Sequence, residues 1–545
     1  MRILLLAMGL LGGGVGAAWA QVAGVEHVVI IGVDGMSPDG VQKAHTPALN
    51  TLIKEGAFSM HARAVLPSSS SPNWASMIMG AGPEQHGITS NDWRPDDFVL
   101  PSTAYASDGY FPTLFWALRE KEPDAVIAVV YDWGGFGNLF AHETVDYAVD
   151  ADGPEKTVEE AIRLLQQERP RLTFIHLDHV DGAGHGEGHG SDVYYQAVER
   201  ADSLIGEVMA GLEQAGMAES TLILVTADHG GEGSGHGGET LSQVEIPWIL
   251  HGPGVAVGRR LTDPINTFDT AATAAFALEL ALPEAWIGRP VRSAFADAER
   301  DPEQPQTGYV PAPRITPRGG LFVDSPPAVQ LAVDDDSAEV HYTLDGSDPT
   351  TSSPRYDAPL VLEGEGAQTL TARAFRGRDT SDPSEAIYRL VTSASGSGPT
   401  YQYYEGEGWQ QIPDFDALTP VREGQAYEFS LEGLDHRAGP FAVRFEGDIE
   451  VEEAGLYTFY TVSDDGSRLY LDGQELVDND GAHGPMVQKG STELEAGRHP
   501  IVVTYFNGEG GQSLEVWYQG PGIPKQIIPS TVLYPATDAR EADTG

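Results

Sequence analysis

Apolar runs alternate with amphipathic segments through the first part of the chain, up to about residue 300. Runs rich in β-branched residues, which predict strands, are His27–Val33, Ala125–Tyr131, Leu172–Leu177, Leu222–Thr226 and Ile246–His251. Helical spacing of apolar residues is found between them, in Thr46–Glu55, Val158–Gln167 and Tyr194–Ala215. Near-continuous apolar strands separated by helices are typical of sheets covered on both faces. We therefore predict an α/β domain with a doubly wound, mostly parallel sheet over 21–300.

The pattern changes after this domain. A segment rich in Pro, Gln and Gly, 301–315, indicates a linker, and short alternating runs such as Ala338–Leu344 and Gln368–Phe375 follow it. Turns with Gly, Asp and Pro separate these runs, which predicts a small β-sandwich over 316–392. A Ser/Gly linker at 393–399 leads into a second all-β domain, 400–536, and a polar tail, 537–545.

The N-terminus has the features of a signal peptide, which we assign to residues 1–20. Arg2 precedes an apolar run that ends in the small-residue pattern Ala18-Trp19-Ala20. The run is short and rich in glycine for a membrane anchor, and no later segment approaches the roughly 18 apolar residues of a membrane helix. We expect a periplasmic or secreted protein without a membrane span after signal removal.

Composition limits the chemistry. The 545 residues include no cysteine, so disulfides, thiolate metal sites and cysteine nucleophiles are excluded, and any metal must be bound through His, Asp, Glu or hydroxyl groups. The formal net charge is −49. Such a surface repels nucleic acid and anionic membranes, so no nucleic-acid binding is expected. High solubility alone is an equally good explanation of the charge.

Metal-ligand residues follow the predicted strands. Asp34 comes after the first strand, Asp181 and His185 follow Leu172–Leu177, and Asp228 and His229 follow Leu222–Thr226. In open α/β sheets the carboxyl ends of the strands form the binding edge. Each group alone could be a turn, a solvated glycine-rich loop or a helix N-cap. Their combination at three strand ends favours a metal site suited to zinc or a similar ion.

A run of four serines precedes a segment of helical character. Ser70 lies two residues before Pro72-Asn73, and a hydroxyl before a helix N-terminus lies where backbone N–H groups attract an anion. A simple N-cap would give the same pattern. A free serine hydroxyl is a poor nucleophile and no Ser-His-Asp signature is evident, so metal coordination is the alternative means of activation.

Ordered motifs in residues 26–290 resemble the alkaline phosphatase superfamily, and within it the type I phosphodiesterase/nucleotide pyrophosphatase branch. The motifs are VVIIGVDGM, SSPNW followed by GPEQHGI, VDGAGH, TADHGGEGSGHGG and IPWILHGPG. The resemblance implies two Zn²⁺ or similar divalent ions. One would be bound by Asp34, Ser70, Asp228 and His229, and the other by Asp181, His185 and His236. His189 lies nearby, but His185 matches the family's ligand better.

The resemblance also implies a role for Ser70 and Asn73. The metal-activated Ser70 hydroxyl would attack phosphorus and form a phosphoseryl intermediate, and Asn73 would contact a non-bridging phosphoryl oxygen. Related sulfatases have an arginine where this chain has Trp74, which argues against sulfate esters. An alkaline phosphatase grips the phosphate with an arginine, and none is evident beside Ser70. The site therefore favours phosphodiesters or pyrophosphates over monoesters.

The two β domains resemble known modules. Val340–Thr350 resembles the C-terminal sandwich of chitobiases and β-hexosaminidases, for which a spacer role is the simpler interpretation. Residues 400–535 resemble the PA14 β-barrel, through segments such as Gly455–Phe459 and Ser463–Gly473. Some sugar-binding members hold Ca²⁺ through an adjacent Asp pair, which here corresponds to Asp464 and Asp465. An Asp-Asp-Gly turn is also a common hairpin.

The sequence thus predicts a secreted two-metal hydrolase of phosphodiester or pyrophosphate bonds, with Ser70 as nucleophile. The PA14 module would bind glycan or cell-surface polysaccharide, with Ca²⁺ at Asp464 and Asp465 as the candidate cofactor. Two alternatives remain open: a phosphomonoesterase or sulfatase-like hydrolase of the same superfamily, and a glycan-binding adhesin with an inactive hydrolase domain. The complete set of seven metal-ligand candidates argues against the adhesin.

Overall fold

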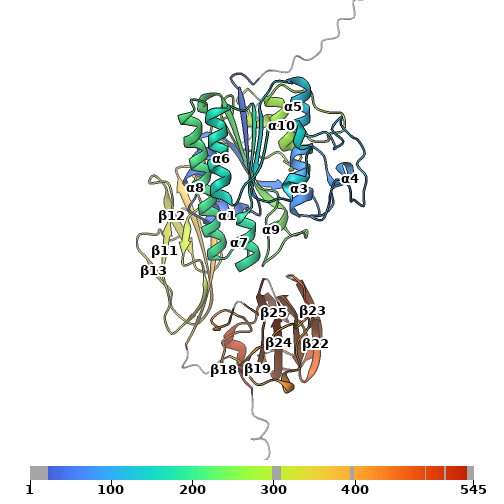
Figure 1. Ribbon diagram of the computed structural model, residues 1–545. Coiled ribbons are helices and arrows are strands. Elements are labelled where there is room, and N and C mark those ends of the chain that lie inside the picture. Colours follow the sequence, from blue (N-terminus) through green and yellow to red (C-terminus); the bar gives the residue numbers. More distant parts are fainter. Residues whose placement is uncertain are drawn as a thin grey trace, which may run out of the picture.

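The computed structural model describes residues 22–297, 309–392, 398–437, 439–484, 486–508 and 511–536. These residues form an α/β domain followed by two β domains (Figure 1). The proposed signal peptide, the tail 537–545 and most of both predicted linkers lie outside the described residues. In this part of the chain, no helix combines the length and the apolar character needed to cross a bilayer.

The first domain is built on one sheet with strand order β4-β3-β5-β1-β6-β7-β2-β8. The strands are β1 (His27–Val33), β2 (Ala57–Arg63), β3 (Ile127–Tyr131), β4 (Tyr147–Asp150), β5 (Leu172–Leu177), β6 (Thr221–Thr226), β7 (Glu245–His251) and β8 (Arg259–Arg260). Strand β1 is parallel to β5 and β6, whereas β7 is antiparallel to β6 and β2. The predicted mostly parallel sheet is confirmed.

Helices cover both faces of this sheet (Figure 1). The helices are α1 (Pro38–Lys43), α2 (Pro47–Glu55), α3 (Ser70–Met79), α4 (Pro83–His86), α5 (Leu114–Lys121), α6 (Pro154–Gln167), α7 (His179–Glu187), α8 (Asp192–Gln214), α9 (Leu241–Val244) and α10 (Asp269–Ala277). Helices α6 and α8 pack together on one side of the sheet, and α3, α5 and α10 pack together on the other. Every residue of β1, β5 and β6 is buried, as their apolar sequences predict.

One element differs from the sequence expectation and positions the site. The glycine-rich segment around Asp181 and His185 was expected to be a loop, but it forms helix α7. Its three glycines would disfavour an isolated helix. Packing against the long helix α8 outweighs this propensity. Asp181 and His185 consequently lie one turn apart on the same helix face.

The second domain is a sandwich of two small sheets, and the third is a larger β domain. The sandwich contains β9 (Arg314–Thr316), β10 (Gly320–Val323), β11 (Ala328–Ala332), β12 (Glu339–Thr343), β13 (Leu360–Val361), β14 (Gly366–Arg376), β15 (Asp379–Thr380) and β16 (Ser384–Val391). The third domain contains β17 (Thr400–Glu405), β18 (Arg422–Gln425), β19 (Phe441–Val451), β20 (Gly455–Asp464), β21 (Ser467–Leu471), β22 (Gln474–Asn479), β23 (Met486–Leu494), β24 (Gly497–Asn507), β25 (Ser513–Gly520), β26 (Ile523–Ile527) and β27 (Leu533–Pro535). Each domain has its own apolar core.

Candidate active site

The candidate metal ligands gather at the carboxyl ends of the three central strands. Asp34 follows β1, and Asp228 and His229 follow β6. Helix α7, with Asp181 and His185, follows β5 directly, and the backbone N–H of Asp34 donates to the carbonyl of Leu177 at the end of β5. The parallel pairing of β1 with both neighbours therefore brings residues nearly 200 positions apart to one edge.

The first group consists of Asp34, Asp228 and His229. His229 Nε2 lies 3.4 Å from Asp34 Oδ1 and 3.1 Å from Asp228 Oδ2, and all three side chains are essentially inaccessible to solvent. The three residues present one ligand atom each, all within 4.8 Å of one another. Ser70 joins this group, because its Oγ lies 3.4 Å from His229 Nε2.

The second group consists of Asp181, His185 and His236. His185 Nε2 lies 3.1 Å from Asp181 Oδ2, and His236 Nε2 lies 3.7 Å from the same oxygen. The two imidazole Nε2 atoms are 3.2 Å apart. The groups are neighbours, since the rings of His229 and His236 stack with centroids 3.8 Å apart. The structure thus brings all seven predicted ligands together.

Backbone carbonyls orient the three imidazoles. His185 Nδ1 lies 2.7 Å from the Ser234 carbonyl, His229 Nδ1 lies 2.8 Å from that of Gly230, and His236 Nδ1 lies 3.0 Å from that of Ser68. A carbonyl only accepts hydrogen bonds, so each Nδ1 is the protonated nitrogen. In the neutral form of each ring the lone pair is therefore on Nε2, which faces the carboxylates. This arrangement prepares a histidine to bind a metal.

The donor set fits divalent cations. Three buried carboxylate oxygens, Asp34 Oδ1, Asp181 Oδ1 and Asp228 Oδ2, have no hydrogen-bond partner within the described residues. Burial, together with the charges of Asp34 and Asp181, raises the pKa of Asp228 well above its usual value. The hydrogen bond to Asp181 raises the pKa of His185 to about 9. Buried carboxylates this close repel one another, and a cation among them would remove that repulsion.

Ser70 is the first residue of α3, and Ser69 is its N-cap. Its neighbours in the serine run have other partners. Ser68 Oγ donates to the Gly238 carbonyl at 2.6 Å, and the backbone N–H of Ser71 donates to Asn91 Oδ1 at 2.8 Å. Among these serines, Ser70 is the one whose hydroxyl contacts a metal-ligand candidate.

Asn73 occupies a different environment from the one expected, and a second asparagine, Asn91, lies at the cleft. Asn73 is fully buried, and its Nδ2 donates to the carbonyls of Pro67 and Ser69 at 3.1 and 2.9 Å. Its amide therefore holds the loop before Ser70, and this geometry does not favour the predicted contact with substrate. Asn91, which the sequence reasoning missed, is exposed and lines the cleft beside His185 and His236. Asn91 Oδ1 accepts the backbone N–H of Ser71, next to Ser70, and its Nδ2 amide group has no hydrogen-bond partner among the described residues, so it can donate to a ligand.

Two further residues hold Asp34 in place. Trp74 Nε1 donates to Asp34 Oδ2 at 2.9 Å, and His176 Nε2 lies 3.4 Å from the same oxygen. Burial alone would lower the pKa of His176, but the carboxylates of Asp132 and Asp34 raise it to about 9. The sequence contained a signal for His176, since it is a histidine inside an otherwise apolar buried strand.

His189 is close to the second group. Its Nε2 lies 3.6 Å from Asp181 Oδ1, its side chain is buried, and neither ring nitrogen has a hydrogen-bond partner among the described residues. Burial lowers the pKa of His189 to about 4. His185 is nevertheless the better placed ligand, because its Nε2 faces both Asp181 and His236.

The acidic pair of the third domain lies at the turn between β20 and β21. Asp465 accepts hydrogen bonds from the backbone N–H groups of His483 and Gly508, at 2.9 and 2.7 Å. Asp464 accepts one from the Ser234 hydroxyl of the first domain. Asn507, which sequence reasoning did not single out, precedes Gly508, and both atoms of its buried amide lack a partner within the described residues.

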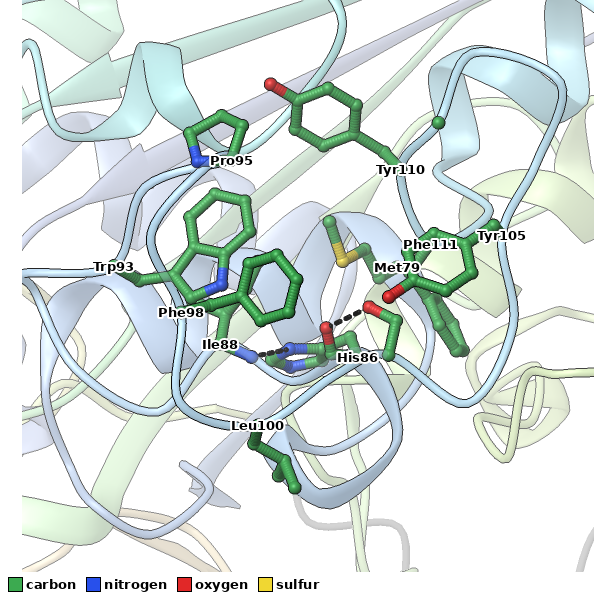
Figure 2. A pocket seen from close by; sticks show the side chains of 12 residues that line it. Met79, His86, Ile88, Trp93, Pro95, Phe98, Leu100, Tyr105, Tyr110 and Phe111 are labelled. Atoms are coloured by element: carbon green, nitrogen blue, oxygen red, sulfur yellow. Dashed lines mark hydrogen bonds between the residues drawn. The ribbon is translucent and has the colours of Figure 1, made fainter.

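A separate aromatic pocket lies beside α4. Figure 2 shows Trp93, Phe98 and Tyr110 around His86, whose Nδ1 accepts the backbone N–H of Ile88. The cavity measures about 40 Å³, which is room for a few water molecules. It is therefore too small for a sugar or a nucleobase.

Comparison with known families assigns the domains. Residues 28–239 match the model of the type I phosphodiesterase / nucleotide pyrophosphatase family, residues 317–387 match the chitobiase/beta-hexosaminidase C-terminal domain, and residues 422–531 match the PA14 domain. The first domain thus matches the nucleotide pyrophosphatase/phosphodiesterase branch of the alkaline phosphatase superfamily. The family resemblances predicted from the sequence are confirmed.

Individual relatives align with part of the chain. Ectonucleotide pyrophosphatase/phosphodiesterase family member 3 of Rattus norvegicus is 27% identical over 220 residues, which are 37% of this chain and 24% of that protein. Human bis(5'-adenosyl)-triphosphatase ENPP4 is 24% identical over 221 residues, 37% of this chain and 47% of that protein. The structure of human ectonucleotide pyrophosphatase / phosphodiesterase 5 covers 50% of this chain and 100% of its own, with 14% identity and a TM-score of 0.44. The chain therefore spans less than half the length of these two curated relatives.

Proposed function

We propose that the chain is a secreted or periplasmic metal-dependent hydrolase that cleaves phosphodiester or pyrophosphate bonds through Ser70. One observation supports this most strongly. Two adjoining groups of carboxylate and imidazole atoms, with buried unpartnered oxygens, lie beside the Ser70 hydroxyl. The family of the first domain and its phosphodiesterase relatives support the same reaction class.

The residues fit two divalent ions, for which we propose zinc. Asp34, Asp228, His229 and Ser70 would hold one, and Asp181, His185 and His236 the other. Nitrogen and oxygen donors without thiolates suit zinc or a neighbouring ion. When bound, such ions supply Lewis acidity, which favours the ionised form of a coordinated hydroxyl and neutralises charge on phosphoryl oxygens.

The chain's own residues position the reaction. Ser70 Oγ would attack phosphorus and expel one alcohol of the diester, which leaves a phosphoseryl intermediate that still carries the second alcohol. Water would then break the Ser70 Oγ–P bond, so that a phosphomonoester leaves and the serine hydroxyl is restored. The N-terminus of α3 places the positive end of the helix dipole at the attacking oxygen. The Asn91 side-chain amide N–H would donate to a non-bridging oxygen, and Trp74 and His176 would keep Asp34 in place.

The surroundings of the site favour diesters. A phosphomonoester or its transition state bears more negative charge than a diester and needs more positive charge nearby. Trp74, which stands where related sulfatases have arginine, is buried and donates to Asp34 instead of facing a substrate. Among the described residues, no arginine or lysine lines the cleft at His185 and His236. Phosphomonoesterase and sulfatase activities are therefore the weaker alternatives.

Turnover by matched serine variants tests the proposal. We expect purified zinc-loaded protein to hydrolyse an aryl phosphodiester faster than the aryl phosphomonoester or sulfate ester. Ser70→Ala should lower diester turnover by about 1000-fold or more while keeping bound zinc, because Asp34, Asp228 and His229 remain. Ser69→Ala is the control, since the Ser69 side chain makes no capping hydrogen bond and turnover should persist.

Other outcomes would select the alternatives. Sulfate or monoester turnover above diester turnover would reassign the substrate within the superfamily. A chain that binds no metal and hydrolyses none of the three esters would support the adhesin. Equal activity of Ser70→Ala and wild type would exclude Ser70 as the nucleophile.

For the PA14 module we propose a Ca²⁺ site at Asp464 and Asp465 that serves glycan binding. The supporting observation is Asn507, whose buried amide oxygen has no hydrogen-bond partner among the described residues and which precedes Gly508, the residue whose N–H binds Asp465. Oxygen donors of this kind suit Ca²⁺. Calorimetric titration of metal-free protein with Ca²⁺ should show one site that Asn507→Leu abolishes, and a glycan array should show calcium-dependent binding. Glycan binding unaffected by chelator would contradict the calcium role.

A further inference from the structure

The PA14 domain closes one side of the candidate active site. In Figure 1 its strands lie below the ends of α7 and α9 of the first domain. Between the two domains lies a cleft of about 1230 Å³, which we call the interdomain cleft. His185, His236 and Glu232 line it from the first domain, and Asp464, His483 and Glu515 line it from the PA14 domain. The proposed hydrolytic site therefore opens onto a surface of the other domain.

Ser234 joins the two walls of the cleft. Its carbonyl accepts the hydrogen bond from His185 Nδ1, and its hydroxyl donates to Asp464 Oδ2. The approach is close, since a Cβ added at Gly511 would lie 2.2 Å from Ser234 Oγ. A proposed metal ligand and the PA14 acidic turn are thus connected through one residue.

The side chains that line the interdomain cleft indicate which class of ligand it can bind. No lysine, arginine, phenylalanine, tyrosine or tryptophan lines the interdomain cleft within the described residues. Without lysine or arginine side chains, the cleft offers no row of cations to match a polyanion such as nucleic acid. Without aromatic rings, it lacks the usual means of binding a quaternary ammonium group or stacking on a base. Carboxylates and amides, including Glu232, Glu515 and Asn91, instead accept from and donate to hydroxyl groups.

We propose that the substrate is a phosphodiester of a neutral carbohydrate, with the carbohydrate bound in the interdomain cleft by residues of both domains. The volume exceeds the 300–1,000 Å³ typical of small-molecule sites and suits more than one sugar unit. This inference rests on the proposed function. It assigns PA14 a part in substrate recognition at the hydrolytic site itself.

Diesters with one leaving group test the assignment. We would compare 4-nitrophenyl esters of methyl phosphate, a hexose 6-phosphate, phosphocholine and thymidine 5′-phosphate, so that the second alcohol alone varies. The hexosyl diester should have the highest kcat/KM, about tenfold above the other three. Glu515→Ala should lower kcat/KM for the hexosyl diester by about tenfold, because the charged hydrogen bond from the carboxylate to a sugar hydroxyl is lost. Turnover of methyl 4-nitrophenyl phosphate should stay unchanged. Glu493→Ala, another exposed carboxylate on the PA14 domain, is the control and should leave both unchanged.

Binding provides a readout independent of turnover. A hexosyl methylphosphonate should bind the Ser70→Ala protein by calorimetry, and Ser70→Ala/Glu515→Ala should bind it about tenfold more weakly. Loss of turnover for every diester would contradict the proposed function. Normal turnover of the methyl diester with no hexosyl preference, or with a preference for the choline or nucleoside ester, would overturn the carbohydrate assignment alone.

Discussion

Trp74 argues against sulfate esters as substrates and also supports the proposed metal site through Asp34. Its position in the serine motif argued against sulfate esters, and in the structure its indole N–H donates to Asp34. The role of Trp74 could not be derived from sequence alone, because β1 and α3 meet only in the folded domain. The metal ligands were easier to predict from the sequence, since a residue directly after a buried parallel strand lies at the binding edge of the sheet. Asn91 was harder, because it lies in a loop far from any strand end.

Trp74→Phe should weaken metal binding without abolishing it. The substitution removes the hydrogen bond to Asp34 and keeps most of the buried ring. Loss of such a supporting hydrogen bond typically costs about 10- to 100-fold in metal affinity. Competition with a zinc chelator measures the change. Trp116→Phe is the control, since Trp116 Nε1 donates to Ser107 away from the site; equal zinc affinity of the two variants would contradict the role of Trp74.

His86 should make the folded domain sensitive to acid. Burial lowers the pKa of His86 to about 3. Below pH 6.5 the unfolded chain takes up a proton that the folded domain excludes until about pH 3. The free energy of unfolding should therefore fall with decreasing pH across this window, by about 1.4 kcal/mol per pH unit from this residue. Urea unfolding of metal-free protein between pH 4 and 7 should show a shallower slope for His86→Asn; parallel slopes would contradict the assignment.

At the scale of elements, the sequence pattern predicted the central strands well and α7 poorly. Strands β1 and β5 agree with their predicted bounds, because apolar runs of this length between turn signals have few alternatives. Helix α7 was expected to be a loop because its glycines lower intrinsic propensity. Its formation depends on α8, a tertiary contact that no local pattern reveals.

The packing of β1 against α3 should tolerate no added methyl group. A Cβ at Gly32 would lie 2.4 Å from the Trp74 ring, so Gly32→Ala should lower the free energy of unfolding by about 1–3 kcal/mol. Gly206 in α8 is the comparison, because a Cβ added there would have room: its nearest neighbour would be Ala48 Cβ at 3.5 Å. Gly206→Ala should raise stability by about 0.5–1 kcal/mol through higher helix propensity. Thermal unfolding of both variants checks the pair, and a destabilised Gly206→Ala would contradict the packing account.

At the scale of the whole molecule, the three domains could be predicted from sequence, but the interdomain cleft could not. Changes in hydrophobic period and two linkers indicated where the pattern changes. The contact between Ser234 and Asp464 joins residues 230 positions apart on the surfaces of separate domains. Surface contacts of this kind leave no periodic signal, so the meeting of PA14 with the active site required the structure.

Gly511→Val should separate the PA14 domain from the hydrolytic site. The added side chain would collide with Ser234, so the interdomain contact should loosen while each domain keeps its own core. Small-angle scattering should show a larger radius of gyration, with methyl diester turnover retained. Gly439→Val is the control, because its Cβ would meet only the Arg437 side chain at 3.6 Å. An unchanged radius for Gly511→Val would contradict the proposed contact.

The central claim is that Ser70, beside two divalent-ion sites, takes the phosphoryl group from a diester. Acid quenching during turnover of an aryl phosphodiester, followed by peptide mapping by mass spectrometry, tests it most directly. The account predicts one modified residue, Ser70, which carries the phosphoryl group with the retained alcohol of the diester, and no modified peptide from Ser70→Ala. Phosphate on another serine of the run, or full turnover with no phosphorylated residue at any quench time, would contradict it.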